Sequence, residues 1–313
     1  MLGYVAVRLL SAIPVLGIVA VFVFFLLTMI PGDPAQVIAG DFASPEQVQQ
    51  IRAALQLDRP LAERFVAWAM RLASGDFGKS LFSGIPVAQL VGQRIEPTLI
   101  LATMTVCIAV VIAVPLGLVA AYKPGGWVAR LSMTTAVLGF SLPVFIVAYL
   151  LVYPLALGLR WFPVQGYVPL SQGLAACLHS LTLPALALSL LYIALIARVT
   201  RAAVLEVLRE DYVRTAHAKG LAERRVLLRH VLRNAAVPVV TVVGIGFAAL
   251  LGGVVVTETI FSIPGLGRLT ADSILRRDYP VVQALILLFS TVYVVVNLGV
   301  DLIYAAIDPR IRY

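Results

Sequence analysis

Charged residues are scarce in this chain of 313 residues. They form 13% of it, whereas hydrophobic residues form 61%. A soluble globular domain carries roughly 25% charged residues, so this chain has too few polar side chains to cover a water-exposed surface. Several of its stretches contain no charge over about 20 residues, the length that crosses a bilayer as a helix. The composition therefore excludes an ordinary soluble domain and predicts a membrane protein.

Cysteine and histidine are also scarce, with two and three copies. Cys107 and Cys177 lack the spacing of metal ligands, and we expect them to be apolar fillers without a disulfide between them. His179, His217 and His230 form no HExxH pattern. No Ser or Cys stands in a recognised nucleophile motif. The sequence therefore predicts no catalytic residue, no metal site and no resident cofactor: the chain is not an enzyme by itself.

A phosphate-binding loop is missing as well. Gly75–Ser80 reads GDFGKS, which ends like the G-x-x-x-x-G-K-[ST] motif. The motif requires a glycine five positions before Gly78, where Ala73 stands, and no apolar strand precedes the segment. We therefore expect that this chain does not itself hydrolyse ATP.

Six apolar segments predict six transmembrane helices. They are apolar all round and lack the period-two alternation of barrel strands, so helices are the structure that satisfies their backbone in lipid. The last part of the long charge-free stretch 161–197 is interpreted as the fourth helix, and its aromatic, Pro/Gly-rich first part as a loop. The segments are Leu9–Gly32, Pro97–Tyr122, Leu131–Leu159, Ser180–Ala197, Asn234–Thr257 and Tyr279–Val300.

The first segment is expected to be a retained helix, because its apolar run is too long for a signal peptide and no small-residue cleavage site follows. Lys and Arg are enriched in the loops that share a side with the N-terminus. This predicts a cytoplasmic N-terminus and, with six spans, a cytoplasmic C-terminus. The net charge of +8 then reflects membrane topology and does not indicate a nucleic-acid partner.

Residues 31–92 are expected outside the cytoplasm and helical. Ser44-Pro45-Glu46-Gln47 has the pattern of a helix N-cap with Pro at the first position and Gln at the third. A second amphipathic stretch follows Pro60 and is predicted by helical spacing of apolar residues at Leu61, Phe65, Trp68 and Leu72. These helices either pack on the outer ends of the spans or contact an external partner, and the two roles are compatible.

Ionisable residues are nearly missing from the predicted spans, with Asp301 as the one candidate for burial. Asp301 lies near the inner interface, so we expect a structural pair with an arginine of that face and not a proton-coupling site. Prolines and glycines interrupt the spans, for example Pro115, Gly244 and Gly252. They indicate either close helix packing or helices that bend during a transport cycle.

A basic segment, Arg198–Arg233, separates two apolar spans. We expect it to continue the fourth helix, turn near Gly220, a natural residue after a helix C-terminus, and resume as a helix. A helix–glycine–helix elbow with small residues suits a groove on another protein. A basic face can equally bind anionic lipid, and the residues alone favour neither.

The sequence YVRTAHAKG, followed by RHVLRNAAVPVVT, resembles the cytoplasmic signature loop of permease subunits of binding-protein-dependent ABC importers. Arg214-Thr215-Ala216 occupies the positions of that loop's Glu-Ala-Ala, with Gly220 as its glycine, and Leu232-Arg233-Asn234 stands where Leu-Pro is often found. These departures are typical of the dipeptide, oligopeptide and nickel branch. Other segments similar to that branch are MLGYVAVRLL, IPGDPA, GDFGKS, PTLIL, TETIFSIPGLGRL, RRDYPVVQ and VDLIYAAIDPRIRY.

The resemblance implies an all-α polytopic protein of the bacterial cytoplasmic (inner) membrane with the type-1 importer permease fold. Residues 1–30 would be the N-terminal helix, 31–92 the outer helical segment, and 93–304 the permease domain with a coupling loop at 199–233. The implied partners are a second homologous permease, two cytoplasmic ATPase subunits that bind ATP and magnesium, and an extracytoplasmic peptide-binding protein. The residues assigned to ATPase docking are Glu210, Asp211, Arg214, Thr215, Ala216 and Gly220.

The implied cargo is a di- or oligopeptide, with glutathione and nickel as alternatives within the same branch. No substrate-binding residue can be assigned from the sequence. The distant alternative is an ion-coupled secondary transporter. That class needs buried carboxylates near the membrane midplane and commonly inverted repeats, and neither is evident in the sequence.

Overall fold

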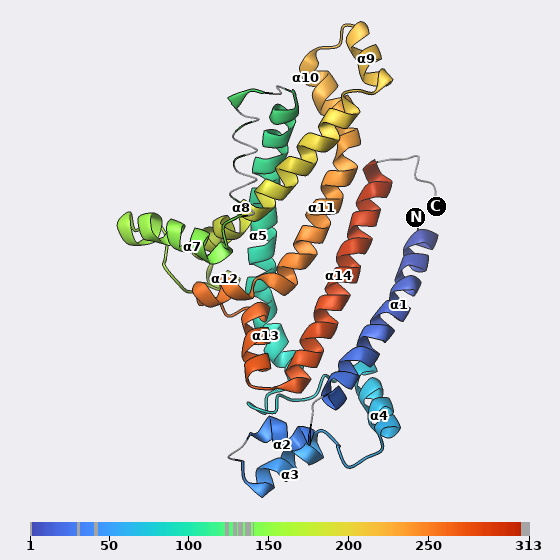
Figure 1. Ribbon diagram of the computed structural model, residues 1–313, viewed down its shortest axis with the longest axis vertical. Coiled ribbons are helices and arrows are strands. Elements are labelled where there is room, and N and C mark those ends of the chain that lie inside the picture. The colour runs from blue at the N-terminus through green and yellow to red at the C-terminus, as the bar shows by residue number, and fades with distance from the viewer. Residues whose placement is uncertain are drawn as a thin grey trace.

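The computed structural model describes residues 2–29, 32–40, 43–122, 125–127, 130, 134, 139 and 141–307. Long helices run side by side through the molecule (Figure 1). Within the described residues no β-strand occurs, and one isolated bridge pairs Lys79 with Pro86. The all-α prediction is therefore confirmed.

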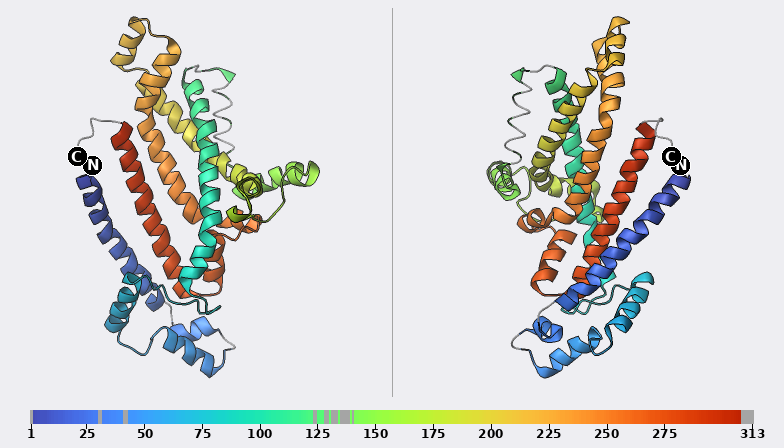
Figure 2. Two further views of the ribbon diagram at one scale, coloured as in Figure 1. Left: turned by 180° about the vertical axis from the view of Figure 1, so that it is seen from behind. Right: turned by 45° about the vertical axis from the view of Figure 1, so that its right-hand side comes forward.

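Four helical stretches of the described residues are long and apolar enough to cross a membrane. They are α5 (Val87–Tyr122), α8 (Leu174–Val207), the stretch from Glu223 to Gly252 that ends in α11 (Leu232–Gly253), and α14 (Tyr279–Ile307). Two shorter apolar stretches, Leu10–Phe25 and Val144–Gly158, lie at the first and third predicted spans. The first belongs to α1 (Leu2–Phe25), which leans against α14 at the flank of the bundle (Figure 2).

The third predicted span, Leu131–Leu159, lies partly outside the described residues. Its described part is α7 (Val144–Val152), which continues as the π-helical turn η2 (Tyr153–Gly158). These turns project sideways from the other helices, as Figures 1 and 2 both show. The bundle and this lateral arm share the largest apolar core, where α5, α7, α8 and α11 meet.

Several predicted span boundaries are wrong. Helix α5 starts at Val87 and passes through Pro97, and α8 extends beyond both ends of the predicted Ser180–Ala197. The fifth span does not reach Thr257, because α11 ends at Gly253 and a separate short helix, α12 (Val255–Ile260), follows. The predicted spans of α5 and α8 were too short because they were limited to charge-free residues. The ends of these helices leave the lipid and therefore tolerate polar residues.

The outer segment consists of η1 (Leu26–Met29), α2 (Pro34–Ala39), α3 (Pro45–Ala54) and α4 (Leu61–Ala73). The predicted cap of α3 is confirmed: Ser44 Oγ accepts from Gln47 N at 3.3 Å, and Gln47 Oε1 accepts from Ser44 N at 2.9 Å. Phe65 and Trp68 of α4 pack against Phe24 of α1, with ring centroids 5.2 and 5.5 Å apart. The packing role expected for this segment is thus confirmed for α4, and contact with an external partner stays a prediction.

The GDFGKS segment is fastened to the end of the bundle. Ser80 Oγ donates to the carboxylate of Asp278, and the backbone N–H of Leu81 donates to the same carboxylate at 3.0 Å. Asp278 lies in the turn between α13 (Leu266–Leu275) and α14. Two sequence motifs far apart in the chain therefore form one structural joint. Among the described residues, GDFGKS follows a helix, whereas a phosphate-binding loop follows a strand.

Glycines allow close approach of helices at two crossings. A Cβ on Gly117 would lie 2.7 Å from the carbonyl oxygen of Ala197, where α5 crosses α8. A Cβ on Gly244 would lie 2.1 Å from Val300 Cγ2, where α11 meets α14. At these positions the close-packing interpretation is confirmed. Gly252 differs, because a Cβ there would meet nothing within 4 Å.

Candidate functional site

The basic segment forms an elbow at one end of the bundle. We use this name for residues 208–225, which follow the end of α8 and include the short helix α9 (Asp211–Ala218) and α10 (Glu223–Arg225). The chain then returns through the π-helical turn η4 (Val226–Val231) into α11. The elbow lies beyond the ends of the other helices, at the end opposite to α2, α3 and α4 (Figure 1).

The ends of α9 follow from its sequence. Glu210 is extended and precedes the helix, Asp211 stands in the first turn and His217 in the last, which suits the helix dipole. Gly220 has φ +72°, a conformation that residues with a Cβ rarely adopt. Its N–H donates to His217 O at 2.9 Å, and Leu221 N donates to Ala216 O at 3.3 Å. The predicted role of Gly220 after the helix C-terminus is confirmed.

The elbow is held by a small apolar anchor. Val213 and Ala216 are 1% and 6% exposed and point from α9 toward the ends of α5, α8 and α11. Their buried partners are Ala121, Ala203, Val204, Val226, Val231 and Ala235. Ala216 was assigned to ATPase docking, and that contact stays a prediction. The small side chain lets α9 pack tightly on the bundle, so Ala216 positions the elbow and does not form its surface.

The opposite side of the elbow is exposed and polar. It presents the other five residues assigned to docking, which are Glu210, Asp211, Arg214, Thr215 and Gly220. Arg214 and Asp211 form an ion pair at 3.4 Å, and both side chains are largely in solvent. An exposed pair of this kind contributes about 0–1 kcal/mol, so a partner protein can rearrange it at little cost. The structure brings these residues together on one face, and their contact with an ATPase stays a prediction.

Two polar contacts hold the elbow in place, one to α11 and one within the elbow. Asn234 Nδ2 of α11 donates to the Tyr212 hydroxyl of α9 at 2.8 Å. His217 Nε2 lies 3.1 Å from Glu223 Oε2, so α9 and α10 are joined across the turn. His217 is therefore half-exposed and has a carboxylate partner. The Tyr212–Asn234 hydrogen bond therefore joins α9 directly to α11.

A buried carboxylate was missed by sequence reasoning. Glu258 of α12 is 0% exposed. It accepts from Thr98 Oγ1 of α5 at 2.6 Å and from the backbone N–H of Arg268 in α13 at 2.8 Å. Thr98 Oγ1 in turn accepts from Leu266 N at 2.8 Å. Glu258 thus joins three elements, and the interpretation of Asp301 as the one buried ionisable residue is wrong. The signal was present in VVVTETIFSIPG, where a glutamate between two threonines stands inside an otherwise apolar stretch.

Asp301 itself pairs with an arginine, as expected. Its Oδ2 atom lies 2.6 Å from Arg8 Nε, and its side chain is 14% exposed. The pair connects α14 to α1 near the end where the elbow lies. His179 Nε2 lies 2.8 Å from the carbonyl oxygen of Trp161. Cys177 is buried in the main core as the expected filler, whereas Cys107 is exposed on α5.

Comparison with known proteins identifies the class. Residues 113–313 match the family described as binding-protein-dependent transport system inner membrane component, and residues 1–102 match the N-terminal part of such membrane components. The chain belongs to this family. It is an ABC importer permease of the inner membrane with several membrane-crossing helices, which confirms the resemblance inferred from the motifs and excludes the secondary transporter.

Two curated relatives match this permease over nearly its whole length. The probable peptide ABC transporter permease protein y4tP of Sinorhizobium fredii is 50% identical over 310 residues, 99% of each chain. The glutathione transport system permease protein GsiC of Escherichia coli K12 is 46% identical over 313 residues, 100% of each chain. The permease is thus similar to proteins of the branch that the motifs indicated.

Solved structures show the same fold. The MetNI methionine ABC transporter in an inward-facing conformation matches with a TM-score of 0.56 at 15% identity, covering 71% of this chain and 97% of that chain. A second crystal form of the same transporter gives a TM-score of 0.55 at 18% identity, with 70% and 97% coverage. Both confirm the type-1 permease fold. The predicted boundaries at 30/31 and 92/93 stay predictions, although residues on both sides of 92/93 belong to the single helix α5.

Proposed function

We propose that this permease is the membrane-spanning subunit of an ATP-driven importer of di- and oligopeptides, and that the elbow is its contact with a cytoplasmic ATPase subunit. The observation that carries the proposal is the division of the elbow into two faces. Val213 and Ala216 are buried against the bundle, whereas Asp211, Arg214 and Thr215 are exposed beyond it. An element that is anchored on one side and polar on the other is suited to transmit force from a partner.

The proposed coupling runs through packed helices. Closure of the ATPase subunits around ATP and magnesium would displace α9, which is packed against the ends of α5, α8 and α11 and braced to α11 by the Tyr212–Asn234 hydrogen bond. These helices would then tilt relative to α14 and change which side of the membrane the pathway faces. Such a shift requires that the ATPases contact one state of the permease more favourably than the other.

The orientation follows from the same assignment. ATP is a cytoplasmic ligand, so the end that carries the elbow faces the cytoplasm. The described ends of α1 and α14, at Leu2 and Ile307, lie toward that end (Figure 1). On this proposal the described ends of α1 and α14 face the cytoplasm, and α2, α3 and α4 face the opposite side, where an extracytoplasmic binding protein would deliver its peptide.

A second permease subunit is proposed to pack on α7. This arm exposes an apolar and aromatic face with Phe145, Tyr149, Leu150 and Tyr153, whose exposed fractions range from 45% to 76%. Tyrosine favours membrane–water interfaces over the lipid interior because its hydroxyl needs a polar partner. A neighbouring subunit can supply that partner, and two permeases together enclose a pathway that a single bundle does not.

A peptide cargo is favoured because the peptide permease relative is 50% identical over 99% of this chain. Glutathione is the second candidate, since the GsiC relative is 46% identical over the full length. Uptake of labelled dipeptide, glutathione and Ni²⁺ by the reconstituted importer separates these cargoes. Transport of dipeptide alone supports the proposal, and transport of Ni²⁺ alone contradicts it.

The elbow is tested by adding a large side chain at Gly220. Gly220→Trp places that side chain on the docking face, where a Cβ meets nothing within 4 Å. We expect normal membrane insertion, loss of most peptide uptake and weaker co-purification of the ATPase subunits. Gly75→Trp is the matched control, because Gly75 also has a positive φ of +80° and open surroundings but lies at the other end of the molecule. Equal uptake by both variants would contradict the docking role.

A further inference from the structure

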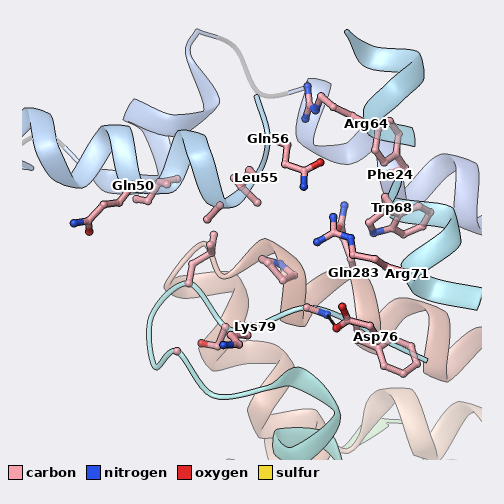
Figure 3. A pocket seen from close by; sticks show the side chains of 18 residues that line it. Phe24, Gln50, Leu55, Gln56, Arg64, Trp68, Arg71, Asp76, Lys79 and Gln283 are labelled. Atoms are coloured by element: carbon pink, nitrogen blue, oxygen red, sulfur yellow. Dashed lines mark hydrogen bonds between the residues drawn. The ribbon is translucent and has the colours of Figure 1, made fainter. Parts of the chain in front are cut away.

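A cavity of about 540 Å³ lies far from the elbow. It is enclosed by α1, α3, α4, the Gly75–Ser80 segment and the start of α14. Figure 3 shows Arg64, Trp68 and Arg71 on the α4 wall, with Gln56 on the side of α3 and Lys79 and Asp76 along the loop. Nothing in the coupling mechanism uses this cavity.

The cavity is lined by cations from two elements. Arg64 and Arg71 lie seven residues apart on α4, with Trp68 between them, so all three share one face of the helix. Lys79 joins them from the loop. The one acidic residue of the wall, Asp76, uses Oδ1 to accept from the backbone N–H of Gly78 at 2.9 Å. The cavity therefore carries an excess of positive charge.

These cations have no carboxylate within 4.0 Å among the residues that the structure describes. Arg64 Nε is buried and has no hydrogen-bond partner there, while the guanidinium carbon lies 6.0 Å from the centre of the Phe24 ring. A buried donor without a partner is costly. An anion bound between Arg64 and Arg71 would compensate the charge of both side chains and could accept from their terminal guanidinium nitrogens.

The position of the cavity indicates the source of the anion. It lies where α1 and α14 reach the end of the bundle, beside the aromatic group Phe24, Phe65 and Trp68. Aromatic side chains of this kind mark the membrane–water interface. Next to them, α1 exposes the apolar side chains of Ile18 and Phe22, at 71% and 54%. Helix α4 exposes Val66 and Met70 away from the cavity, as an interfacial helix does.

We propose that this cavity binds the phosphate of an anionic phospholipid headgroup, with Arg64 and Arg71 as its principal ligands. The acyl chains would extend along the exposed face of α1, and the headgroup would fill the space between α3 and α4. The bound lipid would join the outer segment to the bundle, where Ser80 and Asp278 provide the protein's own joint. The inference requires a membrane surface at this end and is independent of the cargo.

The test is lipid binding to the full-length permease, purified in detergent with its co-purifying subunits. Native mass spectrometry measures titrations with phosphatidylglycerol and with phosphatidylcholine. We expect preferential binding of phosphatidylglycerol, and a loss of about fivefold in affinity for each guanidinium removed in Arg71→Gln and in the double variant Arg64→Gln/Arg71→Gln. Arg59→Gln is the matched control, since Arg59 belongs to the same segment, is exposed and does not line the cavity.

Several results would overturn the proposal. Equal binding of the two lipids, or parental phosphatidylglycerol binding by Arg71→Gln, would exclude a headgroup site. If millimolar inorganic phosphate displaces the bound lipid and neither lipid is preferred, the cavity is a site for a free anion. Loss of contact with the external binding protein in Arg71→Gln, with lipid binding unchanged, would assign it to a protein carboxylate. The half-buried Arg64 could be needed for folding, so that the double variant would be lost. Arg71 is exposed, and its single variant therefore still tests the proposal.

Discussion

Glu258 and Gly265 illustrate how single residues determine this fold. The carboxylate of Glu258 is fully buried and fills the space beside Gly265, so that a Cβ on Gly265 would lie 2.1 Å from Glu258 Oε1. The glycine is required here for space and not for its backbone angles, since its φ of −102° suits any residue. The small residue and the buried acid therefore depend on each other.

Gly265→Ala is expected to destabilise the permease. The added methyl group must displace the Glu258 carboxylate from Thr98 and from the N–H of Arg268, and overpacking of this kind costs about 1–3 kcal/mol. Thermal unfolding of the purified protein measures the loss. Gly299→Ala in α14 serves as the control, because a Cβ there meets nothing within 4 Å. If both variants unfold at the same temperature, the Glu258 joint contributes little to stability.

At the scale of elements, α1 has few neighbours in the bundle and packs chiefly on α14. The ion pair between Arg8 and Asp301, at 2.6 Å, holds one end of this contact, and the hydrogen bond that Gln283 Nε2 of α14 donates to Val23 O of α1, at 3.0 Å, holds the other. Asp301 is 14% exposed at its side chain, so it is more dependent on its partner than a surface carboxylate is. An ion pair in this setting positions the helix as well as stabilising it.

A double-mutant cycle tests this pair. Arg8→Ala leaves the carboxylate of Asp301 without its partner, which we expect to cost about 1–3 kcal/mol, whereas adding Asp301→Ala to that variant costs little more. The measured quantity is the thermal stability of the four proteins in one detergent. Strictly additive effects of the two substitutions would show that the side chains do not interact.

At the scale of the whole molecule, the surfaces proposed for different partners lie at different places. The elbow lies at one end, the outer helices and the anion-binding cavity at the other, and α7 projects from one flank while α1 covers the opposite flank (Figure 2). The two ends of the bundle and the α7 flank therefore present different surfaces. This arrangement would allow one chain to contact the three proposed partners, an ATPase, a binding protein and a second permease, at the same time.

Crosslinking from α7 tests the proposed permease pair. A photoreactive reagent attached at Tyr153→Cys, in a background with Cys107 and Cys177 replaced by alanine, is expected to crosslink the second permease subunit. Ile18→Cys on α1 is the control, since its side chain is similarly exposed, at 71%, but lies on the opposite flank. Adducts with lipid alone from both positions would place the interface elsewhere.

Much of the architecture was decided by local sequence. Long apolar runs require helices in a bilayer, the Ser44–Gln47 pattern determined the start of α3, and Gly220 determined the end of α9. The motifs also identified the family and the elbow. These features depend on residues close together in the chain, so the sequence alone was enough to predict them.

Tertiary structure decided which side chains face inward and which distant residues meet. Glu258 meets Thr98 across 160 positions of sequence, and Arg8 meets Asp301 across 293. The inward face of Ala216 and the convergence of Arg64 with Lys79 likewise depend on how helices pack. Hydrophobicity and periodicity specify that a helix forms, but burial of a polar group depends on partners that only the folded chain brings within hydrogen-bond distance.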